Sequence, residues 1–273
     1  MTAIAPATDG IASTGTTVRA RLGGIAAERI FVRRSLVHSL RDGESLLMAI
    51  LLPVMLMVLF TQVFGGAIAP GGGYVDYIVP GIVLLCAGFG ASSTASSVAR
   101  DMSTGIIDRF RTMPLRPGAV LTGHVVASLV RNLVATGVVI VVALLLGFRP
   151  DAGVPGWLGA LTLISLYILA ITYLFAAIGL AAGTPEAATS YGFVLLFLPY
   201  LSSAFVPVDT MPAWLQPVAR YQPITPIIET LRALLMGADP GGEAGWAIAW
   251  CVGILVVAVV WGRWLFRVKS GRR

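Results

Sequence analysis

The longest uncharged stretch of the chain, residues 152–184, reads AGVPGWLGALTLISLYILAITYLFAAIGLAAGT. A helix needs roughly 20 apolar residues to cross a hydrocarbon core of about 30 Å, so this stretch is long enough. In lipid only helices and closed barrels satisfy every backbone hydrogen bond, and a barrel strand would alternate apolar with polar residues. Because the stretch is continuously apolar, we predict that it forms a transmembrane helix.

Five further uncharged stretches flank this one, and each is long enough to form a membrane span. They are residues 45–75, 77–99, 132–148, 187–208 and 244–262. Charged residues make up only 12% of the chain and apolar residues 57%, whereas about a quarter of an ordinary soluble domain is charged. We therefore predict an all-α membrane protein with six transmembrane helices.

The basic residues lie almost entirely on one side of the predicted spans. Fifteen of the 19 do so: Arg19, Arg21, Arg29, Arg33, Arg34, Arg41, Arg100, Arg109, Arg111, Arg116, Arg263, Arg267, Lys269, Arg272 and Arg273. Only Arg149, Arg220 and Arg232 fall on the other side, and Arg131 falls at the third span. Basic loops stay in the cytoplasm, so both termini are expected there. Basic groups that flank spans argue against a nucleic-acid surface.

Two segments outside the spans have distinctive compositions. Residues 1–24 are rich in Thr, Ala and Gly and predict a disordered cytoplasmic tail. In residues 26–41 arginines interleave with Ile30, Leu36, Val37 and Leu40, which is typical of an amphipathic helix lying in the cytoplasmic interface. The alternative is that these arginines only fix the topology.

The segment 209–237, between the fifth and sixth predicted spans, is broken by prolines yet moderately apolar. Pro223 and Pro226 are two of its four prolines, and they prevent one long helix. We predict an extracellular re-entrant pair of short helices here. Glu229 and Arg232 are three residues apart and are expected to pair on the second helix.

The chain shows no constellation of catalytic residues. His38 and His124 are far apart with no clustered ligands, and no phosphate-binding loop occurs, so neither a metal nor a nucleotide site is predicted. Arg131 and Asn132 interrupt a long apolar stretch and are the candidates for a substrate path, although the first turns of a long helix could instead lie in the cytoplasm. No carboxylate lies inside a span, which argues against an ion-driven transporter.

Several blocks of the sequence resemble the daunorubicin-resistance-type permeases, the membrane subunits of type-2 ABC exporters. The blocks are FGGAI (64–68), DYIVPG (76–81), RD (100–101), GIIDRFR (105–111), MPL (113–115), FVP (205–207), MP (211–212), QPITP (222–226) and ETLR (229–232). The resemblance implies that residues 25–270 form the transmembrane domain of such an exporter. It also implies a subunit that dimerises, with itself or with a second permease, on two separate ATP-binding subunits.

The same resemblance assigns a role to the charged segment after the second span. It implies a cytoplasmic helix that docks on the ATP-binding subunit and couples ATP hydrolysis to transport. The residues concerned are Arg100, Asp101, Gly105, Asp108, Arg109, Phe110 and Arg111. Alternating charge suits a wet interface that transmits motion, while the alternative is a solvated loop whose arginines only set the topology.

We therefore expect a permease subunit in a bacterial plasma membrane that exports an amphiphilic small molecule, antibiotic or lipid-like. The chain itself is expected to be neither an enzyme nor a cofactor-binding protein, since Mg-ATP would bind to the partner. The alternatives are a membrane enzyme acting on lipid and an ion-coupled secondary transporter. The matching blocks do not report the cargo.

Overall fold

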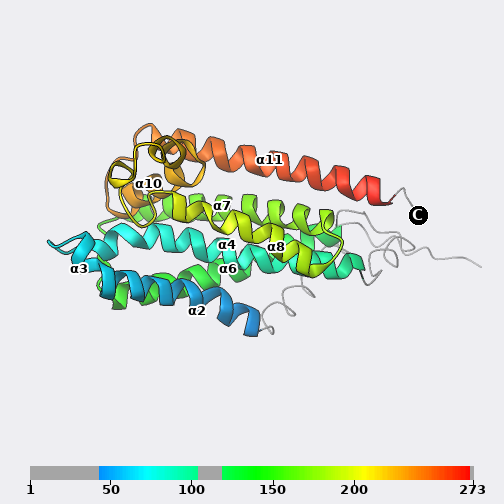
Figure 1. Ribbon diagram of the computed structural model, residues 1–273, viewed down its shortest axis with the longest axis horizontal. Coiled ribbons are helices and arrows are strands. Elements are labelled where there is room, and N and C mark those ends of the chain that lie inside the picture. The colour runs from blue at the N-terminus through cyan, green and yellow to red at the C-terminus, as the bar shows by residue number, and fades with distance from the viewer. Residues whose placement is uncertain (1–42, 104–118, 271–273) are drawn as a thin grey trace, which may run out of the picture.

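The computed structural model describes residues 43–103 and 119–270, and all regular structure in these ranges is helical (Figure 1). The long helices are α2 (Gly43–Leu59), α4 (Tyr74–Ser103), α6 (Ala119–Leu145), α7 (Val154–Ala181) and α11 (Glu243–Ser270). The shorter elements are η1 (Phe60–Phe64), α3 (Gly65–Ile68), α8 (Pro185–Leu196), η2 (Leu198–Leu201), η3 (Val208–Thr210), α9 (Gln216–Tyr221) and α10 (Ile224–Leu235). The predicted tail and the predicted interfacial helix lie outside the described residues.

Helix α4 is the centre of the bundle. It packs against α2, α6, α7, α8 and α10, whereas α11 lies at the periphery on α7 and α10 (Figure 1). Ile78, Ile82 and Leu85 of α4 are completely buried. Small residues along the rest of α4, such as Ala91 and Ala95, let its neighbours approach closely, as is usual where helices pack in lipid.

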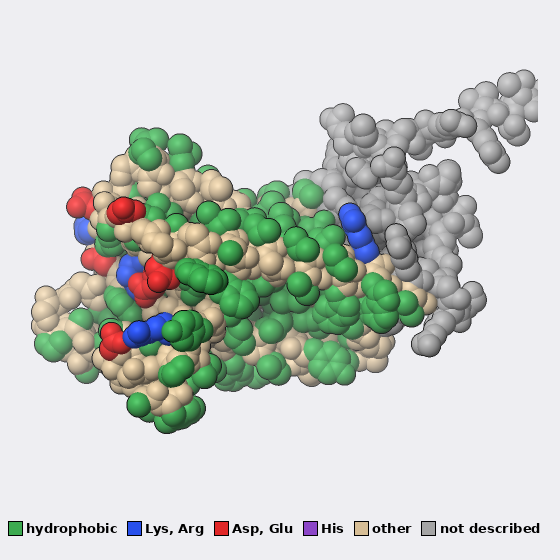
Figure 2. Space-filling view, turned by 90° about the horizontal axis from the view of Figure 1, so that it is seen from above, with side chains coloured by type: hydrophobic (Ala, Val, Ile, Leu, Met, Phe, Trp, Pro, Cys, Tyr) green, Lys and Arg blue, Asp and Glu red, His purple; other side chains and the backbone are tan. Residues whose placement is uncertain are grey.

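Five helical segments in the described ranges are long and apolar enough to cross a membrane. They are Ala49–Ile68, Tyr74–Ser103, His124–Leu145, Val154–Ala181 and Glu243–Leu265. Apolar side chains cover the middle of the molecule, and acidic and basic side chains gather at the end that carries α10 (Figure 2). The prediction of an all-helical membrane protein is confirmed.

The predicted fifth span, residues 187–208, is not one long helix. Helix α8 has 12 residues and is therefore about 18 Å long, short of the hydrocarbon thickness. Pro199 ends the regular helix because it lacks an N–H and its ring clashes with the carbonyl of Leu195. The chain continues as the short 3-10 helix η2, and the Gln222 side chain donates to the carbonyls of Leu198 and Leu201 at 3.1 and 2.7 Å.

Close approach of α4 and α7 depends on one glycine. A Cβ atom at Gly179 would overlap the backbone carbonyl group of Ala95, with the carbonyl carbon only 3.1 Å away. Real side-chain carbons do not come so near to backbone, so the two helices would have to separate.

We expect Gly179→Ala to lower the stability of the purified chain by about 1–3 kcal/mol, the usual cost of overpacking a closely packed site. The matched control is Gly137→Ala on α6, where nothing lies within 4 Å of the added carbon. Because alanine favours a helix over glycine, the control should keep or raise the melting temperature in detergent. Equal melting temperatures for the two variants would contradict this account of the α4–α7 packing.

Candidate functional site

Polar groups line the contact between α4 and α6 over the half that holds the end of α4 and the start of α6. We call this set the polar seam, and its members are Gly90, Ser93, Thr94 and Asp101 of α4 with His124, Ser128, Arg131 and Asn132 of α6. The spacing of the four α6 residues places them on one face of the helix. Membrane helices commonly associate through such interhelical hydrogen bonds.

Hydrogen bonds cross the seam at several levels. His124 Nε2 lies 2.8 Å from Asp101 Oδ2 near the helix ends. Further in, the Thr94 hydroxyl donates to the Ser128 oxygen at 2.9 Å. The seam therefore ties α4 to α6 from the end of α4 and the start of α6 into the membrane span.

Arg131 is buried in the seam and is only 8% exposed. Its Nη2 donates to the Gly90 carbonyl at 2.8 Å and to the Ser93 hydroxyl. A buried guanidinium is tolerated in a membrane bundle only with such partners. These contacts place Arg131 in the bundle interior and hold α4 and α6 together.

Asn132 beside it is completely buried and explains the glycine opposite. A Cβ atom at Gly90 would stand 2.6 Å from the Asn132 side-chain carbon, so only glycine fits. The Asn132 amide oxygen has no hydrogen-bond partner among the described residues. The assignment of Arg131 and Asn132 to a cargo path stays a prediction.

Two of the predicted coupling residues, Arg100 and Asp101, lie on the last turn of α4. Glu186 on the first turn of α8 is close enough to feel the charge of Arg100. The pKa of Glu186 is lowered by its own backbone N–H, by the Thr184 hydroxyl and, to a smaller extent, by Arg100. The remaining predicted coupling residues, Gly105, Asp108, Arg109, Phe110 and Arg111, lie outside the described residues.

At the opposite end of the bundle, Arg232 of α10 joins three segments of the chain. Its Nη1 lies 2.6 Å from Glu229 Oε1, which confirms the predicted pair. Its Nε and Nη2 donate to the Tyr77 carbonyl at 3.2 and 3.0 Å, and Nη2 also donates to the Ser203 carbonyl at 2.9 Å. The guanidinium carbon stands 3.9 Å from the centre of the Tyr77 ring. We call this group the Arg232 clamp.

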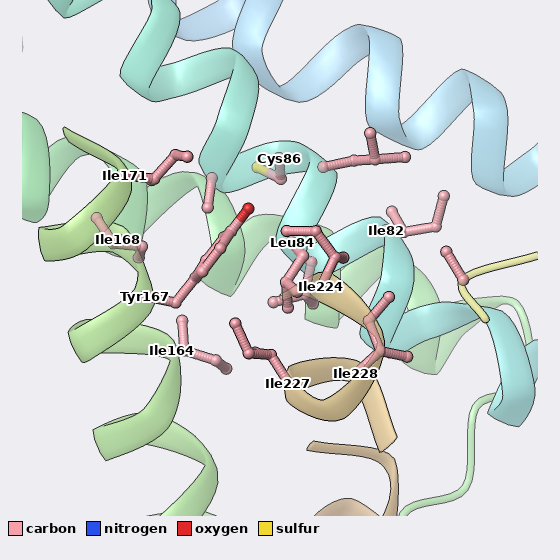
Figure 3. Packing of buried hydrophobic residues seen from close by; sticks show 14 of the residues in the cluster. Ile82, Leu84, Cys86, Ile164, Tyr167, Ile168, Ile171, Ile224, Ile227 and Ile228 are labelled. Atoms are coloured by element: carbon pink, nitrogen blue, oxygen red, sulfur yellow. The ribbon is translucent and has the colours of Figure 1, made fainter. Parts of the chain in front are cut away.

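The two short helices predicted in residues 209–237 are present as α9 and α10. Pro223 directly precedes α10, and Pro226 is buried in its first turn. Ile224, Ile227 and Ile228 of α10 pack between α4 and α7, in one cluster with Leu84 and Tyr167 (Figure 3). At the far end of α10, the Leu235 carbonyl accepts from the Asp151 N–H at 3.0 Å.

Two partners of Arg232, Tyr77 and Ser203, are not recognisable from the sequence. Tyr77 and Ser203 lie 155 and 29 residues before Arg232, and they bind it through backbone carbonyls, which every residue has. His124 was singled out only as an isolated histidine. Its partner Asp101 lies 23 residues earlier in the chain, after the second predicted span, and no spacing rule links the two positions.

In the ranges 43–103 and 119–270, no group of three His, Cys, Asp or Glu residues comes together that could hold a metal ion. Cys86 and Cys251 are free and buried.

Comparison with known families decides what these features belong to. Residues 27–236 match the family described as ABC-2 type transporter. The chain belongs to this family. An ABC-2 permease is the membrane subunit of an ABC exporter and works with a separate subunit that binds and hydrolyses ATP. The chain is thus a multi-pass permease of a bacterial membrane and not an enzyme.

Named permeases match this ABC-2 chain over most of its length. The "daunorubicin resistance ABC transporter permease protein DrrB1" of Streptomyces coeruleorubidus is 28% identical over 92% of this chain and 89% of its own length. The "probable doxorubicin resistance ABC transporter permease protein DrrC" of Mycobacterium tuberculosis is 27% identical over 87% of this chain and 90% of its own. The "putative transport permease ycf38" of Cyanophora paradoxa is 25% identical over 75% and 72%.

The Arg232 clamp predicts a specific pattern of stability losses in this permease. Arg232→Ala removes the donor for two carbonyls and the partner of Glu229, so we expect a loss of about 2–3 kcal/mol. Arg232→Lys should recover less than half of this, because an ammonium cannot reproduce the planar set of donors. Melting temperatures in detergent measure both effects.

The control for the clamp is Arg220→Ala. Arg220 pairs with Asp209 at 2.7 Å, but the two side chains are 57% and 83% exposed. Such surface pairs contribute about 0–1 kcal/mol, so this variant should melt close to the wild type. A lysine variant as stable as the wild type would show that Arg232 contributes only its charge.

Proposed function

We propose that this permease exports an amphiphilic small molecule, antibiotic or lipid-like, across the bacterial plasma membrane. The observation that carries the proposal is the family match over residues 27–236, extended by relatives whose names refer to daunorubicin and doxorubicin resistance. In this proposal two permease chains, identical or different, sit on two copies of the ATP-binding subunit. Mg-ATP binds to that subunit, and the permease itself carries no cofactor.

We also propose that the chain crosses the membrane six times. The fifth crossing in chain order, which none of the five long helices makes, is made by α8 and η2 together, since α8 alone is too short. The buried position of Ser202 and Ser203 after η2 supports an end of this span inside the protein and away from lipid. A broken span of this kind is tolerated where neighbouring helices satisfy its backbone, as Gln222 does here.

The helices α9 and α10 are proposed to form the re-entrant hairpin on the extracellular side. Three isoleucines of α10 reach the main hydrophobic core between α4 and α7, and its last turn returns to the loop before α7 (Figure 3). A hairpin that enters from outside and leaves on the same side fits both contacts. The Arg232 clamp would then fasten the hairpin to the outer end of α4.

Both termini are proposed to be cytoplasmic. Helix α11 ends at Ser270, at the end of the bundle opposite α10 (Figure 1). This is the end to which the sequence assigns most basic residues, in accordance with the positive-inside rule.

Cysteine labelling of Thr210→Cys, in a background of Cys86→Ala and Cys251→Ala, tests the topology. Thr210 lies in η3 at the end that carries α10, so we expect a membrane-impermeant maleimide to react with intact cells. Ser103→Cys at the other end should react only after the membrane is opened. The reverse pattern would overturn the proposed orientation.

Reconstitution in liposomes tests the function. The chain alone should neither hydrolyse ATP nor concentrate doxorubicin, since a solute moves uphill only when an energy source is coupled to it. With its ATP-binding subunit it should do both, and collapse of the proton gradient should leave the transport largely intact. Uptake by the chain alone that disappears with the proton gradient would instead favour a secondary transporter.

The coupling segment has a test of its own. Arg109→Glu with Arg111→Glu should reduce retention of the ATP-binding subunit by about tenfold or more, because like charges at an interface cost several kcal/mol. Arg272→Glu with Arg273→Glu is the control, since it makes the same charge change outside the matched segment. Normal retention and transport in the first variant would return Arg109 and Arg111 to a role in topology alone.

A further inference from the structure

The polar seam reaches its cytoplasmic end at Asp101 and His124. These residues lie near the end of α4 and the start of α6, the two helices between which the proposed coupling segment is inserted. Their hydrogen bond therefore joins α4 and α6 close to the two ends between which that segment lies in the sequence. A carboxylate oxygen can only accept, so the Nε2–H of His124 donates to Asp101 Oδ2 across 2.8 Å.

The end of α4 is held differently on its other side. Val98 and Met102 pack against Leu180 of α7 and Leu265 of α11 in a small apolar cluster. Apolar contacts of this kind are not directional and permit sliding, whereas a charge-assisted hydrogen bond fixes the geometry of both partners. The bond to His124 is thus a directional contact between the end of α4 and α6.

The pair is accessible but not fully solvated. The side chains of His124 and Asp101 are 22% and 28% exposed, so water weakens their bond less than it would at a free surface. The next contact of the seam, from Thr94 to Ser128, lies seven residues further along α4. Loss of the Asp101–His124 bond would therefore loosen about two turns of α4 from α6 while the inner seam remains closed.

We propose that Asp101 and His124 form a latch that makes the cytoplasmic ends of α4 and α6 move as one body. The inference rests on the proposed docking role of residues 100–111. A push on the coupling segment then displaces both helices together, and the seam carries the displacement toward the outer end. Both residues act through the helices that they join, so both are positioning residues.

The test uses the full permease with its ATP-binding subunit in liposomes and needs no knowledge of the cargo. Three quantities are measured: the retained ATP-binding subunit, the rate of ATP hydrolysis, and the ATP-induced change in the labelling rate of a Thr210→Cys thiol in the background of Cys86→Ala and Cys251→Ala. His124→Ala should leave the first two near wild type. It should reduce the ATP-induced labelling change about tenfold, the factor expected for loss of a hydrogen bond to a charged group.

Two variants separate a latch from a merely structural residue. His124→Gln places an amide nitrogen close to the position of Nε2 and should restore the labelling change. Ser103→Ala is the matched control at the same helix end, because its hydroxyl bonds only within α4, to the Arg100 carbonyl at 2.9 Å. This control should behave as the wild type does.

The outcomes distinguish this inference from the function on which it rests. If the wild-type permease retains no ATP-binding subunit, the proposed function fails first. If the subunit is retained and His124→Ala shows a normal labelling change, or if the wild type shows none, the latch is wrong. Equal losses in His124→Ala and His124→Gln, or a loss that only follows the amount of assembled complex, would also overturn it.

Discussion

Hydrocarbon offers no hydrogen-bond partner, and this constraint determines where each polar group of the permease can lie. Polar side chains within the spans bond either to their own helix, as Thr162 and Ser165 do, or to a neighbouring helix, as they do in the seam between α4 and α6. Arg131 shows the principle most clearly, because its charge is placed against the backbone of α4 and a serine hydroxyl. Beyond Asn132, toward the other end of the helix pair, Ala135 and Val139 of α6 are buried in the main apolar core. Apolar packing predominates there, and the Asp76 carboxylate at the start of α4 accepts from the Arg149 N–H just after α6 at 3.0 Å.

The Arg232 clamp obeys the same constraint at the opposite end of the bundle. Breaking the fifth span at Pro199 and inserting a hairpin leave backbone carbonyls without helical partners. The clamp satisfies that of Ser203 and also binds the Tyr77 carbonyl of α4, and Gln222 satisfies those of Leu198 and Leu201. Side chains with several donors, an arginine and a glutamine, are therefore what the irregular region requires. The seam and the clamp thus satisfy polar groups at opposite ends of the bundle.

The sequence predicted well what depends on local composition. Uncharged runs located five spans because the cost of a charge in lipid acts at each residue separately, and the three-residue spacing of Glu229 and Arg232 predicted their pair. Apolar composition predicts the fifth span as a single helix. The structure breaks it near Pro199, because proline disrupts the backbone of a helix whatever the composition around it. From the sequence, Gly90 is recognisable only as a small residue. Glycine is required there because the side chain of Asn132, 42 residues later, fills the adjoining space. Contacts of this kind depend on the register between helices, which composition does not report.

The contrast between α4 and α11 has a consequence for how the sequence can change. Among the described residues, helix α4 packs against five other helices, whereas α11 packs mainly against α7 and α10. Large residues of α11 such as Val256, Val260 and Trp264 are exposed. Lipid accepts almost any apolar side chain, so the outward face of α11 can exchange one for another with little effect. Each position on α4 must instead match the shape of several partners at once. Amino-acid differences among exporters of this kind should therefore be more frequent on peripheral helices such as α11 than on the central helix α4.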